Sequence, residues 1–148
     1  MVRLITSLNW VVGFLALILA VGYPFFNSVV MQTTAEYSGK NLVKEVLKGQ
    51  RGQYNTHEKY VYYSPDKSTI EAFSSKLGLM SVPQATSDFD IYSFRTDDKI
   101  LIVRAVLNKQ KVSEGWLPPM LYEHVIEKPG TAGEGKWLKL SNRTLALF

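Results

Sequence analysis

The chain has 148 residues, of which 46% are hydrophobic and 20% are charged, and its formal net charge at pH 7 is +4. It contains no cysteine, which excludes a disulfide framework and any metal or nucleophilic site that depends on a thiolate. The positive charge is spread along the chain and is densest at Lys40, Lys44, Lys48 and Arg51. We interpret this run as the solvated face of a helix, the alternative being a surface for anionic lipid or nucleic acid.

An apolar segment over residues 8–31 dominates the N-terminal part of the chain, and Tyr23 is its only ionisable side chain. A helix needs about 20 mostly apolar residues to cross the hydrocarbon core of a bilayer. The alternative is the core helix of a soluble protein, which rarely contains so long an uncharged run. The sequence therefore predicts a membrane anchor over residues 1–31 and one domain over residues 32–148, long enough to have its own core.

The residues around the apolar segment predict an anchor that is not cleaved. A cleavable signal peptide combines a charged start, an apolar run of about 7–15 residues and a small-x-small site. Here the run is longer, and the bulky Tyr23 and Pro24 stand where small residues are needed. We expect a single-pass membrane protein. Lys40 and Lys44 after the segment, against Arg3 before it, favour a cytoplasmic domain but lie too far along the chain to decide.

One face of the anchor is rich in small residues. Gly13, Ala16 and Ala20 recur at spacings of three and four, and helices in lipid associate through close packing of such residues. Trp10 and Tyr23 lie farther toward the two ends, where amphipathic rings favour the membrane interface. The alternative is that the small residues simply face lipid. We predict a docking and interface set on the anchor made of Trp10, Gly13, Ala16, Ala20, Tyr23 and Pro24.

The helix is predicted to continue beyond the membrane, from Leu8 to about Tyr54, with a bend near Pro24. Past the apolar segment, apolar residues still recur at helical spacing while the four cations occupy other faces. These apolar residues are Leu42, Val43, Val46, Leu47 and Tyr54. Three glycines, Gly39, Gly49 and Gly52, each lower helix stability by about 1 kcal/mol relative to alanine. Glycine in such a stripe often marks the close approach of another backbone.

A short, punctuated region follows the long helix. An aromatic cluster at residues 60–63 precedes a turn signal, Ser64-Pro65-Asp66. Ser68 or Thr69 can then cap a short helix that ends at Gly78. The aromatic cluster suits core or lid packing between two helices better than a stacking platform for nucleic acid or sugar.

Four segments with the pattern of β-strands follow, at residues 89–95, 100–107, 120–126 and 136–140, and residues 143–148 are apolar enough for an edge strand or a docked tail. The sequence predicts an α+β fold in which a long N-terminal transmembrane helix continues into a helix packed on a four-stranded antiparallel sheet. The core should bury Leu42, Val43, Val46 and Leu47 against Ile91, Ile100, Ile102 and Trp137.

No set of residues has the spacing of a catalytic, cofactor-binding or metal site. His57 and His124 are the only histidines, and neither has a second ligand at metal spacing. Glu123 and His124 are adjacent in a predicted strand and would point to opposite faces. No phosphate-binding glycine loop or nucleophile elbow occurs. We expect a protein that is not an enzyme and that has no cofactor, metal, small-molecule substrate or nucleic-acid partner.

Two stretches of the long helix carry a resemblance to a known family. Residues 12–20 read Val-Gly-Phe-Leu-Ala-Leu-Ile-Leu-Ala, and residues 23–27 read Tyr-Pro-Phe-Phe-Asn. They resemble the N-terminal helix of type IV pilins and pseudopilins. Residues 48–54, Lys-Gly-Gln-Arg-Gly-Gln-Tyr, are similar to a segment of cyanobacterial-type pilin-like proteins. The resemblance implies a pilin-like fold over the whole chain.

The start of the helix departs from that family. Pilins have a glycine before the bond that is cleaved, and a nearby glutamate that neutralises the new amine of a neighbouring subunit. Here residues 3–10 read Arg-Leu-Ile-Thr-Ser-Leu-Asn-Trp, and no acidic residue precedes Glu36. We therefore expect a pilin-like fold that is not processed by a prepilin peptidase and does not form ordinary filaments.

Two function classes follow from this combination. The first is an accessory or stabilising subunit of a larger membrane protein complex, for which a photosynthetic or respiratory complex would be a suitable host. Its partners would be the lipid bilayer and other membrane-protein subunits. The alternative is a minor pilin or pseudopilin of a type IV pilus or a type II secretion system. The missing cleavage signature favours the first class.

Overall fold

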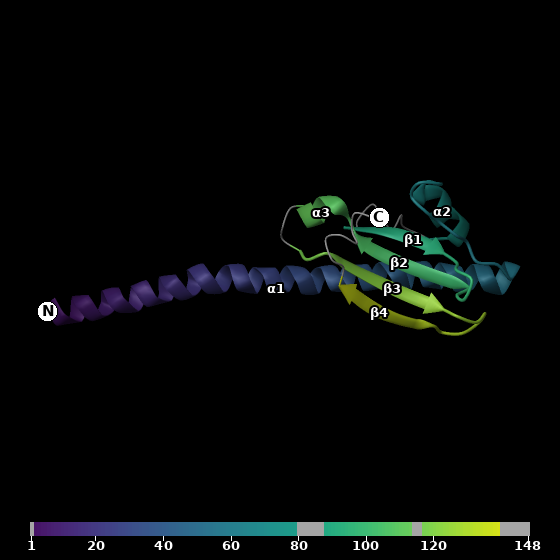
Figure 1. Ribbon diagram of the computed structural model, residues 1–148. Coiled ribbons are helices and arrows are strands. Elements are labelled where there is room, and N and C mark those ends of the chain that lie inside the picture. The colour runs from purple at the N-terminus through teal and green to yellow at the C-terminus, as the bar shows by residue number, and fades with distance from the viewer. Residues whose placement is uncertain (1, 80–87, 114–116, 140–148) are drawn as a thin grey trace.

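The computed structural model describes residues 2–79, 88–113 and 117–139. A long N-terminal helix, α1 (Val2–His57), packs through its C-terminal part on a four-stranded antiparallel sheet (Figure 1). This confirms the predicted α+β architecture.

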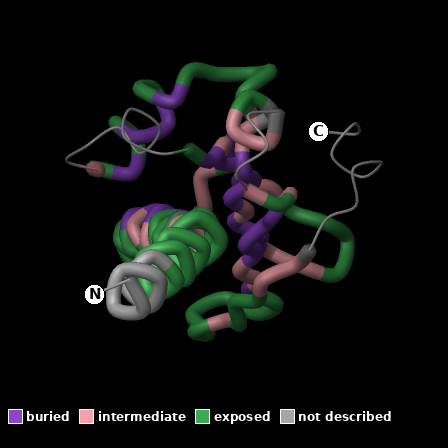
Figure 2. Tube along the Cα trace, turned by 90° about the vertical axis from the view of Figure 1, so that its left-hand side faces the viewer, coloured by how far each residue is buried: buried purple, intermediate pink, exposed green. Residues whose placement is uncertain are grey.

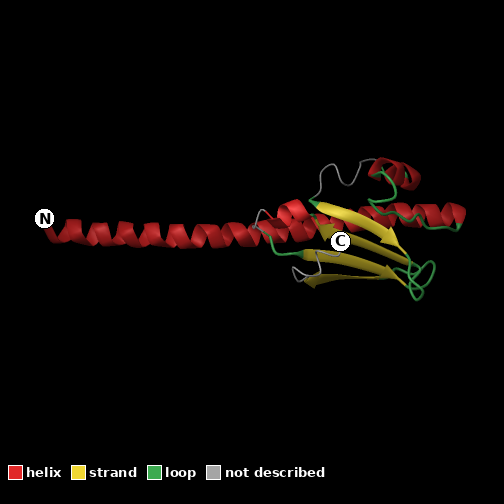
Figure 3. Cartoon of the chain, turned by 45° about the horizontal axis from the view of Figure 1, so that its top comes forward, coloured by secondary structure: helices red, strands yellow, loops and turns green. Residues whose placement is uncertain are grey.

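Helix α1 runs without interruption for 56 residues. The predicted continuity from the apolar segment into the domain is therefore confirmed, and the helix is longer than expected at both ends. Pro24 lies inside it, and the helix curves gently in Figure 1 and is nearly straight in the view of Figure 3, with no sharp kink. Burial against the domain begins at Ala35, which is 7% exposed.

The sheet is a meander in the order β1-β2-β3-β4, built from β1 (Phe89–Phe94), β2 (Leu101–Leu107), β3 (Met120–Ile126) and β4 (Glu134–Lys139). All three pairings are antiparallel. The expected third strand agrees with β3, whereas β4 begins two residues earlier than expected. The predicted edge strand or tail at residues 143–148 lies outside the described residues.

The core lies between α1 and one face of the sheet. Val43 and Val46 on α1 are fully buried, and Leu42 and Leu47 beside them are 5% exposed. In Figure 2 buried positions lie on the helix and on the sheet, among other places, while α1 is mostly exposed from residue 10 to the start of the domain. The sheet contributes residues from its three first strands to this cluster: Phe89, Ile91, Leu101, Val103, Ala105, Leu107, Met120, Tyr122 and Ile126.

The expected partners of the helix were partly wrong. Ile91 belongs to the core cluster and Trp137 packs against it, but Ile100 and Ile102 do not belong to it. In β2 it is Leu101 and Val103 that share the cluster with α1. Side chains alternate between the two faces of a strand, so Ile102 lies on the other face. Because β2 is apolar on both faces, its sequence does not indicate which residues face the helix.

Helix α2 (Ile70–Leu77) is confirmed together with its predicted caps. The hydroxyl of Thr69 accepts a hydrogen bond from the Ala72 amide at 3.3 Å. Gly78 ends the helix in the left-handed conformation, at φ 62°. The helix lies beyond β1 in Figure 1. The fifth element, α3 (Lys109–Ser113), was not predicted, although Asn108 caps it by accepting the Lys111 amide at 2.9 Å.

Candidate functional site

The described part of the chain contains one helix long and apolar enough to cross a membrane. The apolar part of α1 has a mean hydropathy of 1.9, and none of it is buried inside the chain. Trp10, the first described side chain, is 81% exposed, and Tyr23 is 68% exposed. Length and composition alone are shared by signal sequences and by core helices, but a core helix of this fold would be covered. This apolar part of α1 is not covered by the domain.

The small residues of the anchor share one face of α1. At 3.6 residues per turn, Gly13, Ala16, Ala20 and Pro24 fall within an arc of about 80°. A side chain at Gly13 would meet no atom within 4 Å, so the chain itself covers nothing there. Because proline has no amide hydrogen, Pro24 also leaves the carbonyl of Ala20 without its usual helical donor. None of the described residues covers this face, and the docking role predicted for it stays a prediction.

The aromatic cluster belongs to the domain. Tyr63 is 5% exposed and stacks on Phe73 with ring centroids 4.6 Å apart, and Tyr60 packs against the core cluster. Burial raises the pKa of the Tyr63 hydroxyl above its ordinary value. Tyr62 is 45% exposed, and its hydroxyl donates to the Ile100 carbonyl at 3.2 Å. This placement agrees with the expected packing role.

A buried glutamine that was not predicted fastens this connection to α1. Gln50 is fully buried, and its amide nitrogen donates to the Val61 carbonyl at 2.5 Å and to the Ser93 hydroxyl at 3.0 Å. Its amide oxygen accepts the Val61 amide at 2.9 Å. One side chain thus satisfies both backbone groups of Val61. Gln50 continues the buried stripe of Val43 and Val46, so helical spacing could have identified it.

Glu123 and His124 lie on different faces of β3, as expected. Glu123, on the face away from α1, accepts a hydrogen bond from Arg104 Nε at 3.0 Å. His124 Nε2 lies 2.8 Å from the Ala132 carbonyl on the α1 side. Since a carbonyl only accepts, Nε2 carries the proton. His57 is the last residue of α1 and is exposed. Among the described residues, no three His, Asp or Glu side chains lie close enough to hold a metal ion.

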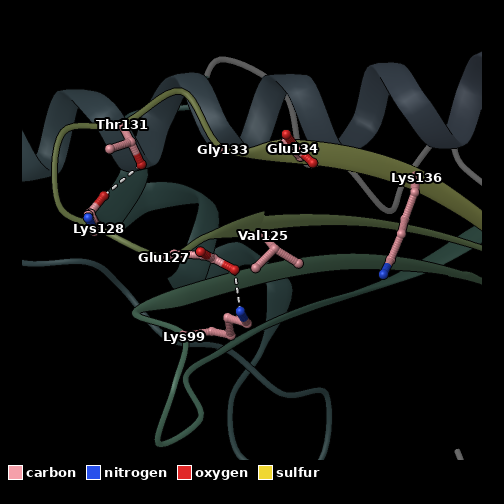
Figure 4. Close-up of a pocket in the computed structure, with 8 residues that line it drawn as sticks. All are labelled: Lys99, Val125, Glu127, Lys128, Thr131, Gly133, Glu134 and Lys136. Carbon is pink, nitrogen blue, oxygen red and sulfur yellow. Dashed lines mark hydrogen bonds and ion pairs between the residues drawn. The ribbon is translucent and has the colours of Figure 1, made fainter.

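An open pocket lies on the sheet face away from α1, at the end where β3 turns into β4 (Figure 4). Its charged groups are mixed, since the side chains of Lys99, Lys128, Lys136, Glu127 and Glu134 all line it. Lys99 and Glu127 form an ion pair, and this hydrogen bond lowers the pKa of the Glu127 carboxyl and raises that of the Lys99 amine.

The same pocket is shaped by a turn. The Thr131 hydroxyl donates to the Lys128 carbonyl at 2.8 Å, and Gly130 has a φ of 74° that glycine adopts without strain. These contacts explain how the residues around the pocket are arranged, and no ligand is needed for that explanation.

A second depression is lined by positively charged side chains and by no negatively charged ones among the described residues. It lies between α1 and the sheet at β3 and β4, and we call it the cationic groove: Lys44, Leu47, Lys48, Arg51, Tyr122, His124 and Gly135. Three cations from α1 line it, and no carboxylate does among the described residues. Arg51 Nη2 lies 3.4 Å from the Ala132 carbonyl, which also accepts from His124. The cations were predicted to form a solvated helix face, and the sheet residues opposite them were not identified from the sequence.

The floor of the cationic groove includes the side chain of a buried tyrosine. Tyr122 is 6% exposed and packs against Trp137 with ring centroids 5.0 Å apart. A Cβ at Gly135 would lie 2.1 Å from the Tyr122 oxygen, so glycine leaves the room that this hydroxyl occupies. Burial raises the pKa of Tyr122 above its ordinary value of 10.0, which keeps it an O–H donor at neutral pH.

Comparisons of the chain with models of protein families, with curated proteins and with solved structures found no match.

Proposed function

We propose that this chain is a non-catalytic, single-pass membrane protein that acts as an accessory or stabilising subunit of a larger membrane protein complex. One observation supports this most directly: an exposed apolar segment is continuous, through one uninterrupted helix, with a domain that has its own core. The uncleaved segment would hold the domain at the membrane. In this proposal the surfaces of the domain act by binding.

The two parts of α1 leave separate surfaces for partners. Apolar residues are exposed as far as Met31, and burial in the domain starts at Ala35. The small-residue face suits a neighbouring transmembrane helix, because small side chains let two backbones approach closely in lipid. A donor on such a helix would also satisfy the Ala20 carbonyl that Pro24 leaves without a partner. The domain would contact a different part of the complex.

A minor pilin or pseudopilin is the second candidate. Its support is the architecture itself, a long helix whose C-terminal half packs on an antiparallel meander, which is the fold that the pilin resemblance implies. The residues ahead of the small-residue face carry no glutamate that could neutralise a neighbouring amine. This difference favours a heteromeric complex over a filament of copies.

Substitution of Gly13 by leucine tests the docking face. Gly22 lies about 180° around the helix from Gly13 and also has no atom within 4 Å of an added Cβ, so Gly22→Leu is a matched control. Native membranes expressing tagged full-length variants are solubilised in mild detergent, and copurifying proteins are identified. We expect Gly13→Leu to lose partners that the parent and Gly22→Leu retain, while all three resist extraction from the membrane by alkaline carbonate.

Two results would contradict the proposal. If Gly13→Leu retains the same partners as Gly22→Leu, the small-residue face is not a docking surface. If the parent copurifies only with copies of itself in extended assemblies, the filament alternative replaces the accessory role.

A further inference from the structure

The cations of the cationic groove form no ion pair with another residue in the described part of the chain. The ion pairs among the described residues involve Lys99, Arg104 and Lys111, and none involves Lys44, Lys48 or Arg51. Like charges along one helix repel each other. A cluster of this kind facing an apolar floor is favourable when a negatively charged ligand occupies it.

The inner side of the groove is formed by side chains of the sheet. Trp137 packs against the Tyr122 ring, with ring centroids 5.0 Å apart. His124 is oriented by its bond to the Ala132 carbonyl, and its other nitrogen, Nδ1, lies 3.0 Å from the position of a Cβ at Gly135. The Tyr122 side chain is therefore part of the lining of a depression whose rim is cationic. Leu47 adds an apolar surface beside it.

The position of the groove argues against a lipid headgroup as its ligand. Lys44 lies thirteen residues beyond Met31, which at 1.5 Å per residue is about 20 Å along α1. The headgroup layer extends only roughly 5–8 Å beyond the hydrocarbon core. Even a tilt of about 40° leaves Lys44 roughly 15 Å above the core. The bilayer surface that anchors the protein does not reach these side chains.

The length of the cationic row indicates an extended ligand. From Lys40, one turn before the groove, to Arg51 the row covers eleven residues, or about 16 Å along the helix. A single small anion contacts only part of such a row, whereas about five residues of extended peptide span it. Nucleic acid is a poorer fit, because sequence-independent binding depends on many phosphate contacts, typically about 6–10. The apolar floor at Leu47 and Tyr122 suits an apolar side chain placed between carboxylates.

We propose that the cationic groove binds an acidic segment of a partner protein, with carboxylates on Lys44, Lys48 and Arg51 and one carboxylate oxygen on the Tyr122 hydroxyl. This inference rests on the proposed accessory function and identifies the domain surface and the chemistry of the partner.

The test measures binding of defined probes to the full-length protein in detergent micelles. The main probe is a fluorescent peptide of Glu-Glu-Phe-Gly repeats, and the matched control peptide has glutamine in place of glutamate. An oligonucleotide of equal charge and inorganic phosphate are the competing probes. We expect the acidic peptide to bind, to weaken as salt is raised, and to be displaced by neither the glutamine peptide nor millimolar phosphate.

Two sets of variants locate the binding surface. Lys44→Glu/Lys48→Glu should weaken peptide binding by about tenfold or more, because repulsion replaces attraction at close range. Lys59→Glu/Lys67→Glu makes the same change in net charge at exposed positions outside the groove. Its peptide binding should weaken only by the small amount that the lower net charge of the protein causes. Tyr122→Phe keeps the ring and removes the hydroxyl, and should weaken binding several-fold, roughly the value of one hydrogen bond to a charged group.

Unchanged binding by the groove variants, or equal losses in both double variants, would overturn the inference. Tighter binding of the oligonucleotide, or full displacement by phosphate, would assign the groove to a different ligand. Copurification with the host complex is scored in parallel. A parent chain with host partners but no affinity for the peptide refutes the groove alone, whereas a parent chain without host partners refutes the accessory function.

Discussion

Two glycines three residues apart on α1 have different surroundings. A Cβ at Gly49 would lie 2.9 Å from the Leu77 Cβ and 3.0 Å from the Leu77 carbonyl oxygen, whereas a Cβ at Gly52 would meet nothing within 4 Å. Gly49 therefore marks the close approach of α1 and α2 that the glycine spacing predicted. Gly52 is exposed and marks no such approach.

These surroundings predict opposite effects of alanine. Gly52→Ala should raise the free energy of unfolding by up to about 1 kcal/mol, the difference in helix propensity. Gly49→Ala gains the same propensity but overfills a close contact with backbone, which costs roughly 1–3 kcal/mol, so it should be neutral or destabilising. Urea unfolding followed by near-ultraviolet circular dichroism compares the two variants. An equal stabilisation by both would show that α2 can move away from α1 without cost.

Gln50 gives the second prediction at this scale. Leucine at this position fills similar space but removes both glutamine bonds to the partly buried backbone of Val61, and should lower the free energy of unfolding by about 2–3 kcal/mol. Ser93→Ala is the matched control, because Gln50 retains both bonds to Val61 and the loss should be about 1 kcal/mol. If the two variants lose equal stability in urea unfolding, the Gln50 bonds to Val61 are not the main contribution.

At the scale of elements, the sequence predicted what depends on local periodicity and caps. The period of 3.6 residues placed Leu42, Val43, Val46 and Leu47 on one buried face, and the Thr69 and Gly78 signals placed both ends of α2. The same rules did not predict α3, because a five-residue helix has too few turns to show a period. Its cap, Asn108, was the one signal present.

What could not be predicted depends on contacts between elements. Strand β2 is apolar at nearly every position, so either set of alternate residues was compatible with facing α1, and the choice of Ile102 was wrong. The cationic groove could not be predicted for the same reason, because it also depends on contacts between elements. Its helix residues were visible as a row of cations, but Tyr122, His124 and Gly135 join them only through the register of β3 with β4.

At the scale of the whole molecule, one helix belongs to two environments. Its first half has large apolar side chains that are exposed in the chain, such as Phe14 and Phe25, and its second half forms one wall of the domain core. The exposed and buried parts of the helix are separated by only a few residues around Thr33. Removing the exposed apolar part should therefore leave the folding of the domain intact, whereas removing the part that packs on the sheet should not.

Truncation at two points tests this division. A chain that starts at residue 32 retains the part of α1 that packs on the sheet. We expect it to be a soluble protein that unfolds cooperatively. A chain that starts at residue 52 lacks Leu42, Val43, Val46 and Leu47, all of which are at most 5% exposed. Burial of such a side chain contributes about 1.5–3 kcal/mol, so the four together supply roughly 6–12 kcal/mol.

That sum is comparable to the whole stability of a typical domain, about 5–15 kcal/mol, so the shorter chain should show no cooperative transition. Thermal unfolding followed by circular dichroism, together with the dispersion of amide signals in proton NMR, distinguishes the two chains. A cooperative transition in the chain that starts at residue 52 would show that the sheet and α2 fold without α1. Aggregation of the chain that starts at residue 32 would show that the membrane segment also stabilises the domain.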